Sequence, residues 1–319
     1  MCIVKSLYFL IVLIISTWSL NSSAQSYNIG NTPITIYDAD RDRNIETIIY
    51  YPSDTGGEHA PIASGEFPVI VFGHGFLMNW QSYQNFWEEL VPEGYVMCFP
   101  NTETGLFPNH GNFGSDLKFV ASAMQLENTD NTSLFYNSLL PETALLGHSM
   151  GGGASFLGAE NNMSINTLVN FAAAETNPSA ISAAANVTVP TLIFSGDDDC
   201  VTPAAAHQDL MYSNLSTDCK TQISIIDGGH CYFANNDFFC STGEASCNPI
   251  LNITRNEQQQ ITFDFLKLWL EYTLYGNETA FITFNDDLQS SSQINYGQVC
   301  NTLSISNTMT QMEISVSPN

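Results

Sequence analysis

A serine lies between two glycines in the segment Gly147-His148-Ser149-Met150-Gly151, which matches the pattern G-x-S-x-G. A serine hydroxyl is a weak nucleophile at neutral pH, so it needs a base and a backbone that presents it. The two glycines permit a sharp turn that projects the serine from the end of a strand at the start of a helix. The pattern alone arises by chance in roughly one chain of this length in ten, so its surroundings must support it.

The surroundings of Ser149 fit this turn. The apolar run 143–146 predicts a short strand directly before it, and 151–161 predicts a helix directly after it. Gly152, Gly153 and Ala154 give that helix no bulk, so it can pack close to the sheet. The alternative is a glycine-rich helix start that serves only packing or holds an anion.

A carboxylate that could orient a base follows a later strand. The strand expected at 191–194 is followed by three aspartates, Asp197 to Asp199, at the edge where an open α/β sheet places its site. Asp199 is favoured because it comes last, before an apolar residue and Pro203, so its side chain can turn inward. The alternative is that the acidic run is a solvated loop.

A histidine follows the next strand, in the order serine, acid, histidine that this kind of turn requires. His230 comes shortly after the strand expected at 222–226, behind two glycines that let its loop approach the serine. We therefore expect Ser149 to attack an ester carbonyl, His230 to take and return the proton, and Asp199 to orient the imidazole. The alternative for a single histidine is a structural role.

Acyl transfer also needs hydrogen-bond donors for the negative oxygen that forms on the substrate. The residue after the nucleophile supplies one donor, the N–H of Met150. The loop 73–76, which follows the strand expected at 67–72, supplies the second, for which the Phe76 N–H is the best candidate. The alternative for this loop is a plain glycine turn.

Strands and helices that alternate along most of the chain position these residues. The pattern predicts an α/β fold with a mostly parallel central sheet and helices on both faces. The segment 172–190 between two strands is too short for a cap domain. The other expected strands are 32–37 and 44–51 (a hairpin), 95–99 and 167–171, and the other expected helices are 80–93, 115–128, 204–215 and one that begins with a capping box at Thr254–Glu257.

The N-terminus predicts export. Lys5, the apolar run 7–15 and Ser22-Ser23-Ala24 form a signal peptide over residues 1–24, and polar residues from Thr17 onward interrupt the run before it could span a membrane. We expect one catalytic domain over 25–300. The tail 301–319 is rich in Ser, Thr and Asn, and its end resembles the start of a sorting segment for type IX secretion.

Composition limits the partners. Seven Lys and Arg against 32 Asp and Glu give a formal charge of −25, which argues against nucleic-acid binding and stable membrane association. The chain has 319 residues and is 44% hydrophobic, enough for a sizeable core. Only 12% of residues are charged, so the polar surface is largely uncharged, which favours a secreted protein. We expect a monomer.

Seven cysteines remain beyond the signal peptide, and most should pair in an oxidising compartment. Cys98 lies in an apolar strand and is the candidate for the free thiol. The other six allow fifteen connectivities, of which proximity favours Cys200–Cys219 and Cys240–Cys247. No CxxC pair indicates zinc and no carboxylate spacing identifies calcium, so neither a metal nor a cofactor is expected.

Over residues 67–275 the sequence resembles the α/β-hydrolase fold, and within it the secreted bacterial polyester hydrolases (cutinases and PET hydrolases) and dienelactone-hydrolase-like esterases. The segments Gly147–Gly153 (GHSMGGG) and Val189–Phe194 (VPTLIF) carry the resemblance. It implies a serine esterase that acts on an ester or polyester substrate. Dienelactone hydrolases proper have cysteine in the place of Ser149, which argues against that activity.

The resemblance also assigns site residues. It implies an aromatic oxyanion-hole residue at Phe76, the acid at Asp199, the base at His230 and an apolar subsite at Val201, with Phe76 and Met150 also facing substrate. The sequence departs from better-known members in two places. No Trp is present in 172–175, where many of them carry an indole for aromatic substrates, and cysteines follow Asp199 and His230.

Three functions therefore stand beside one another. The first is a secreted polyester hydrolase with an open cleft, and the second is a carboxylesterase or lipase that acts on short-chain esters only. The third is a non-catalytic binding module that kept the fold. Such a module should have lost one catalytic residue, whereas Ser149, Asp199 and His230 are all present.

Overall fold

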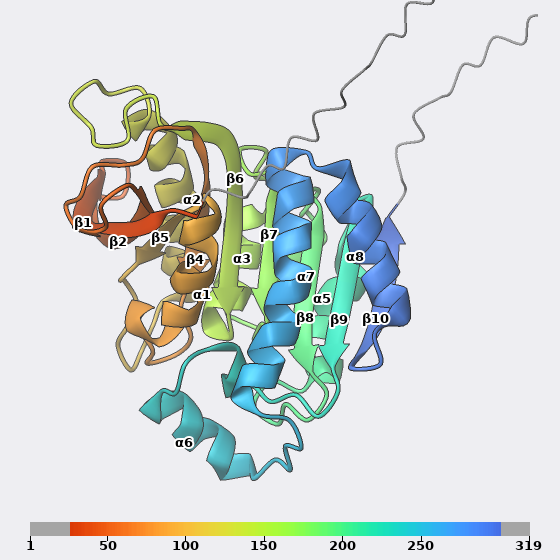
Figure 1. The fold of residues 1–319 in the computed structure, drawn as a ribbon. Helices are drawn as coiled ribbons and strands as arrows, with labels where there is room; N and C mark the ends of the chain where they lie inside the picture. The colour runs from red at the N-terminus through yellow and green to blue at the C-terminus, as the bar shows by residue number, and fades with distance from the viewer. Residues whose placement is uncertain (1–25, 301–319) are drawn as a thin grey trace, which may run out of the picture.

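A ten-stranded sheet forms the centre of the protein in the computed structural model, which describes residues 26–300 (Figure 1). Its strand order is β10-β9-β8-β7-β6-β4-β5-β2-β1-β3. Six central strands run parallel to one another: β4 (Phe67–Gly73), β5 (Val96–Pro100), β6 (Leu139–His148), β7 (Thr167–Phe171), β8 (Thr191–Gly196) and β9 (Cys219–Ile225). Of the outer strands, β2 (Arg43–Ser53) runs antiparallel to β5 and to β1 (Asn28–Asp38), and β10 (Ile294–Cys300) runs antiparallel to β9. The short β3 (Gly57–Glu58) pairs in parallel with β1.

Helices cover both faces of this sheet (Figure 1). One face packs against α1 (Gln84–Leu90), α7 (Arg255–Tyr275) and α8 (Glu278–Ser290), and the other packs against α2 (His110–Glu127), α3 (Met150–Ala159), α4 (Ala180–Ala184) and α5 (Gln208–Asn214). The helix α6 (Phe238–Cys247) lies apart from both layers, beyond the carboxyl ends of the central strands (Figure 1). The predicted fold class is confirmed.

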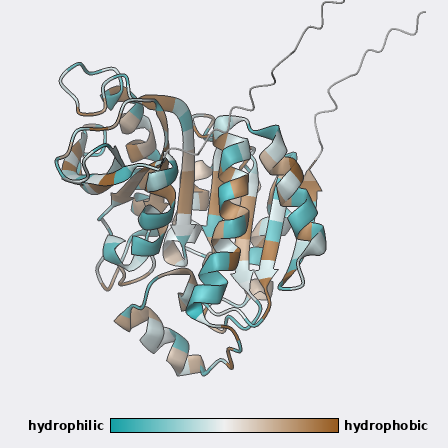
Figure 2. Cartoon of the chain, viewed as in Figure 1, coloured by the Kyte–Doolittle hydropathy of each residue, from teal (hydrophilic) through white to brown (hydrophobic). Residues whose placement is uncertain are grey.

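The sequence FPVIVF explains why β4 lies in the middle of the sheet. All seven residues of the strand are buried. Ile70 and Phe72 contribute to the core on the α7 face, and Val69 and Val71 contribute to the core on the α3 face. A strand covered on both faces has no polar side chain to place, which is why its apolar run is continuous. Figure 2 shows the same concentration of hydrophobic residues along the central strands.

The boundaries of several elements differ from those expected. β6 is longer than the predicted strand 143–146, and α2 begins at His110 rather than at residue 115, after a cap in which the Asn109 side chain accepts from the Asn112 N–H. The helices α4, α6 and α8 and the edge strand β10 were not predicted.

The expected signal peptide (1–24) and tail (301–319) lie outside the described residues. Within residues 26–300 no helix combines the length and apolarity needed to cross a membrane.

Both disulfides favoured by proximity in the sequence are wrong. The bridges are Cys200–Cys247, Cys231–Cys240 and Cys219–Cys300. Cys240 and Cys247 lie on one helix, about 10 Å apart along its axis, which is beyond the roughly 7 Å that a disulfide can span. Cys200 follows the carboxyl end of β8 while Cys219 begins the parallel neighbouring strand β9, so these two lie at opposite ends of adjacent strands. Cys98 is buried and free, as predicted, and burial raises the pKa of its thiol.

Candidate active site

Ser149 occupies a strained turn between β6 and α3. Its backbone has φ 54° and ψ −119°, a conformation that non-glycine residues rarely adopt, and its N–H donates to the Phe171 carbonyl at 3.0 Å. The flanking glycines are needed because the backbones cross here. A Cβ on Gly147 would lie 2.3 Å from the Gly151 oxygen, and one on Gly151 would lie 2.2 Å from the backbone of Gly73. Only glycine fits at either position.

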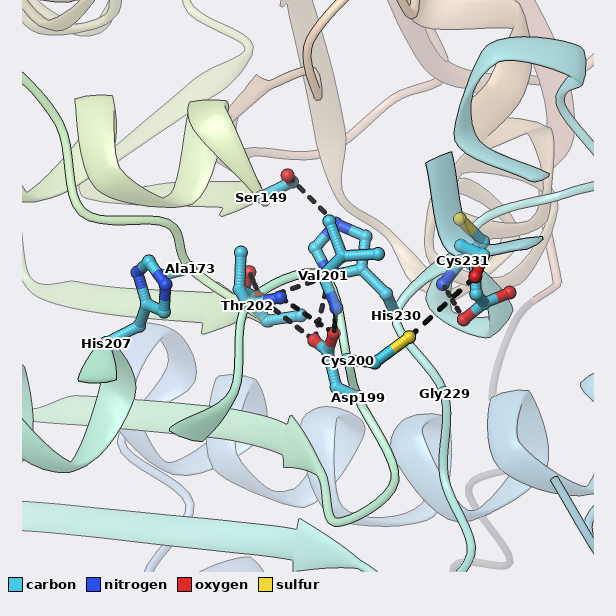
Figure 3. Close-up of polar contacts among 12 residues, drawn as sticks. Ser149, Ala173, Asp199, Cys200, Val201, Thr202, His207, Gly229, His230 and Cys231 are labelled. Carbon is cyan, nitrogen blue, oxygen red and sulfur yellow. Dashed lines mark hydrogen bonds and ion pairs between the residues drawn. The ribbon is translucent and has the colours of Figure 1, made fainter. Parts of the chain in front are cut away.

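The turn brings the predicted serine, acid and histidine together (Figure 3). The Ser149 hydroxyl lies 2.9 Å from Nε2 of His230, and Nδ1 of the same ring lies 2.8 Å from Oδ2 of Asp199. His230 and Asp199 are almost fully buried, and Ser149 is 9% exposed. The other two aspartates of the acidic loop, Asp197 and Asp198, remain in contact with solvent. The three side chains that the sequence singled out therefore form one continuous hydrogen-bonded line.

Asp199 is held in its charged form. Burial alone would raise the pKa of its carboxyl, but the adjacent His230 and the hydrogen bonds around the carboxylate hold that pKa below its usual value. The backbone N–H groups of Val201 and Thr202 donate to Oδ1 at 2.8 and 2.9 Å. A carboxylate with these donors is fixed in place and accepts the Nδ1 proton of His230, which leaves Nε2 to face Ser149.

Thr202 is a site residue that the sequence reasoning missed. Its hydroxyl donates to Oδ2 of Asp199 at 2.8 Å and lies 3.0 Å from Nδ1 of His230 (Figure 3). The residue is buried, and Gln208 donates to its hydroxyl from the other side at 3.3 Å. The available signal was the spacing of Asp199 and Thr202, because a hydroxyl three residues after an aspartate in a turn can fold back onto the carboxylate.

Two backbone N–H groups of the predicted site are without a protein partner in the part of the chain that the structure describes. Those of Phe76 and Met150, the predicted oxyanion donors, form no hydrogen bond to another protein group between residues 26 and 300. Phe76 is 46% exposed and Val201 is 37% exposed, so both can meet a bound molecule. Met150 is only 4% exposed and packs in the core, so the structure leaves its side chain little surface for the predicted contact with substrate.

The loop that carries His230 is supported by α7. The side chain of Gln258 donates to the Gly229 carbonyl and accepts from the Gly229 N–H, both at 2.9 Å. Arg255 donates to the carbonyls of Cys231 and Ala234. The capping box expected at Thr254 is present and begins this helix. Helix α7 therefore fixes the base loop on both sides of His230.

Metal ligation is not indicated by the arrangement of the described side chains. Among residues 26–300, no three His, Cys, Asp or Glu side chains converge as a metal site would require. The chemistry open to this site is that of a buried imidazole between a hydroxyl and a carboxylate, beside two N–H donors.

Known proteins resemble this chain over its catalytic region. A bis(hydroxyethyl) terephthalate hydrolase from Streptomyces coelicolor is 27% identical over 172 residues, which cover 53% of this chain and 50% of that protein. A cutinase from Thermobifida alba is 26% identical over 185 residues, 57% of this chain and 56% of the cutinase. The chain thus spans about half the length of the curated relatives it matches. The model of the PET hydrolase-like family matches residues 41–243, more than half of the chain, which therefore belongs to this family of α/β hydrolases.

Proposed function

We propose that the protein is a serine hydrolase of carboxylic esters, with Ser149 as nucleophile, His230 as general base and acid, and Asp199 as the residue that orients the imidazole. The observation that carries the proposal is the unbroken contact from Ser149 through His230 to Asp199. Among residues 26–300 the N–H groups of Met150 and Phe76 have no protein partner, so both can donate to substrate. The membership in the PET hydrolase-like family supports the same chemistry.

The reaction follows from these positions. Nε2 of His230 accepts the Ser149 proton as Oγ attacks the ester carbonyl, and the resulting oxyanion accepts from the N–H groups of Phe76 and Met150. The imidazolium then gives its proton to the leaving alcohol, which departs and leaves an acyl-enzyme on Ser149. Water, deprotonated by His230, attacks the acyl carbon and releases the acid and the free serine. The negative charge of Asp199 stabilises the imidazolium in both halves, and no step requires a cofactor.

We infer that the substrate is a chain-like ester such as a polyester. The names of the two relatives, a terephthalate-ester hydrolase and a cutinase, support this class. The exposed side chains of Phe76, in the loop after β4, and of Val201, in the loop after β8, offer apolar surface to a polymer. Between β7 and β8 the chain forms only the five-residue α4, too little to cover the site as a cap. Three disulfides suit the oxidising compartment of a secreted protein.

Two measurements test the proposal. Ser149→Ala should lower the turnover of a soluble nitrophenyl ester by at least about a thousandfold while the protein stays folded, because it removes the hydroxyl that contacts Nε2 of His230. A fluorophosphonate probe should label wild type and leave this variant unlabelled. An unchanged rate in Ser149→Ala would refute the enzyme assignment.

The substrate class needs its own comparison. Release of soluble acids from an amorphous aromatic polyester film is measured beside hydrolysis of short-chain nitrophenyl esters by the same preparation. A polyester hydrolase releases product from the film in a reaction that Ser149→Ala abolishes. Turnover of the short esters with no film product would instead assign the second function, a short-chain carboxylesterase.

A further inference from the structure

We propose that Tyr83 and His148 are positioning residues for the reaction: a buried hydrogen-bond chain through their side chains sets the oxyanion loop and the base loop relative to the nucleophile. This inference rests on the proposed function, because it assigns a role to groups that do not themselves touch substrate.

The chain consists of three hydrogen bonds. The Gly75 N–H donates to the Tyr83 hydroxyl at 2.7 Å, and that hydroxyl lies 2.9 Å from Nδ1 of His148. The other ring nitrogen of His148, Nε2, lies 3.1 Å from the backbone carbonyl of His230. Tyr83 and His148 are both fully buried. Solvent water therefore cannot reach these groups to replace a lost hydrogen bond.

The direction of every hydrogen bond in this chain follows from its two ends. The His230 carbonyl can only accept, so Nε2 of His148 carries the proton. In a neutral imidazole Nδ1 is then an acceptor, and the Tyr83 hydroxyl must donate to it. The oxygen of Tyr83 is left to accept from Gly75. Burial, with the nearby His230 acting in the same direction, lowers the pKa of His148 to about 3, so the ring stays neutral and this direction holds at neutral pH.

The hydrogen-bond chain joins the three segments that carry the reacting groups. Gly75 precedes Phe76 in the loop after β4, His148 ends β6 directly before Ser149, and His230 lies in the loop after β9. Tyr83 ends a short 3₁₀ helix, Trp80–Tyr83, and fills the space under the oxyanion loop. A Cβ on Gly75 would lie 2.7 Å from the Met78 sulfur, so the loop packs closely there.

Catalysis is sensitive to such positioning because oxyanion donors stabilise the transition state only when they point at the oxygen that becomes charged. Without the Tyr83 hydroxyl, the Gly75 N–H and Nδ1 of His148 both become buried groups without a partner. The loop must then shift to satisfy them. The Phe76 N–H moves with it, while Phe76 and Val201 keep their exposed apolar side chains for substrate.

Tyr83→Phe is the first test, since it removes only the hydroxyl. We expect kcat for a soluble ester to fall about tenfold or more, with KM changed less than about twofold. The matched control is Tyr51→Phe, which removes another fully buried hydroxyl that is hydrogen-bonded at 2.7 Å, to the Ala60 carbonyl. Tyr51 lies far from the carboxyl ends of the parallel strands, where the site is. Its neighbour Tyr50 pairs with Met97, which is at the amino end of β5. The control should lose stability and keep kcat.

A purely structural role for Tyr83 predicts that both variants lose stability and that both keep kcat per labelled serine. Equal kcat values in Tyr83→Phe and Tyr51→Phe, each normalised to the endpoint of fluorophosphonate labelling, would overturn the inference. If wild type fails to hydrolyse esters, or Ser149→Ala still does, the proposed function fails and this inference falls with it. If Ser149 is required and Tyr83→Phe behaves as the control does, only the positioning role fails.

A double-mutant cycle tests whether the two residues act as one chain. The amide of His148→Gln can reach the position of Nε2 and donate to the His230 carbonyl, while the acceptor at the position of Nδ1, which faces Tyr83, is lost. If the chain is real, the loss of kcat in the double variant is clearly smaller than the product of the two single losses, because both changes break the same hydrogen bond between Tyr83 and His148. Multiplying losses would overturn the chain. His148→Asn keeps the acceptor and loses the donor, so it provides a second break if Tyr83→Phe does not fold.

Discussion

At the scale of single residues, Thr202 gives the acid a hydroxyl that one substitution can remove. Its hydroxyl donates to Asp199 at 2.8 Å in a buried site, and hydrogen bonds to charged groups are worth about 1.5–3 kcal/mol. Thr202→Val keeps the shape and removes the donor. We expect kcat/KM to fall about tenfold, whereas Thr202→Ser, which keeps a hydroxyl, stays within about threefold of wild type.

The same variant should change acid stability. The pKa of Asp199 lies below its usual value in the folded protein, so its ionised form stabilises the fold above the unfolded pKa of about 3.9. That stabilisation is lost as pH falls through the folded pKa. Loss of the Thr202 donor raises the folded pKa, so acid unfolding of Thr202→Val should begin at a higher pH than that of Thr202→Ser. Coincident acid-unfolding curves, followed by circular dichroism, would count against this role.

His148 gives a second pH dependence, of the fold rather than of the chemistry. Burial lowers its pKa to about 3 in the folded state, while an unfolded imidazole titrates near 6.5. Between these values the unfolded chain binds the extra proton, so the free energy of unfolding falls as pH drops, by up to about 1.4 kcal/mol per unit. Above pH 6.5 this dependence vanishes. His148→Gln has no such group, so urea unfolding at pH 7, 6, 5 and 4 should give a flatter dependence; parallel curves would contradict the prediction.

The sequence could predict Ser149, Asp199 and His230 because a parallel sheet fixes both their order and their place at the ends of strands. It could not predict Tyr83 or the role of His148. Their hydrogen bonds join segments that are far apart in the chain, and no local pattern records which side chain meets which. Thr202 differs, because its spacing from Asp199 is a local signal.

At the scale of elements, the buried strands and long helices follow from apolar periodicity, whereas α6 does not. Its sequence, FFCSTGEASC, has no apolar stripe, and only Cys240 and Glu244 are buried. Two disulfides hold it instead. Cys231–Cys240 ties it to the residue after His230, and Cys200–Cys247 ties it to the residue after Asp199. Pairing the cysteines by their proximity in the sequence failed because such a bridge joins elements that are close in the fold and not necessarily close in the sequence.

This arrangement predicts that α6 clamps the acid and base loops. A disulfide that closes a loop of 47 residues stabilises a fold by about 4 kcal/mol in the chain-entropy estimate. Cys200→Ser with Cys247→Ser should therefore lose esterase activity on heating several degrees before the sheet unfolds, because the loops loosen first. The control pair is Cys219→Ser with Cys300→Ser, whose bridge joins β9 to β10 at the edge away from the site.

In the control pair, activity and the secondary structure seen by circular dichroism should be lost together, at a lower temperature than in wild type. If the α6 variant behaves in the same way, with activity and secondary structure lost in one transition, then α6 has no separate hold on the site. The comparison uses the intact chain throughout, since each variant removes both partners of one bridge and leaves no unpaired thiol from it.

At the scale of the whole molecule, the charge affects where the enzyme can work. The strands within residues 26–300 form a single sheet, and the site lies at the carboxyl ends of its parallel strands. The chain carries a formal charge of −25 with only seven Lys and Arg residues. Hydrolysis of a polyester film leaves carboxylates on its surface. If a polyester is the substrate, as proposed, a protein this acidic is repelled by the film that it hydrolyses, although a neutral soluble ester feels no such repulsion.

Salt should therefore accelerate film hydrolysis and leave the soluble reaction alone. Charges are felt over about 30 Å at 0.01 M salt but only about 8 Å at 0.15 M, so the repulsion between film and protein collapses over this range. We expect film hydrolysis to rise severalfold between these concentrations, while kcat/KM for a neutral nitrophenyl ester changes less than about 1.5-fold. A film hydrolysed beforehand with alkali carries more carboxylate and should show the larger salt effect. Equal salt effects on film and soluble ester would mean that salt acts on the site itself rather than on the approach to the surface.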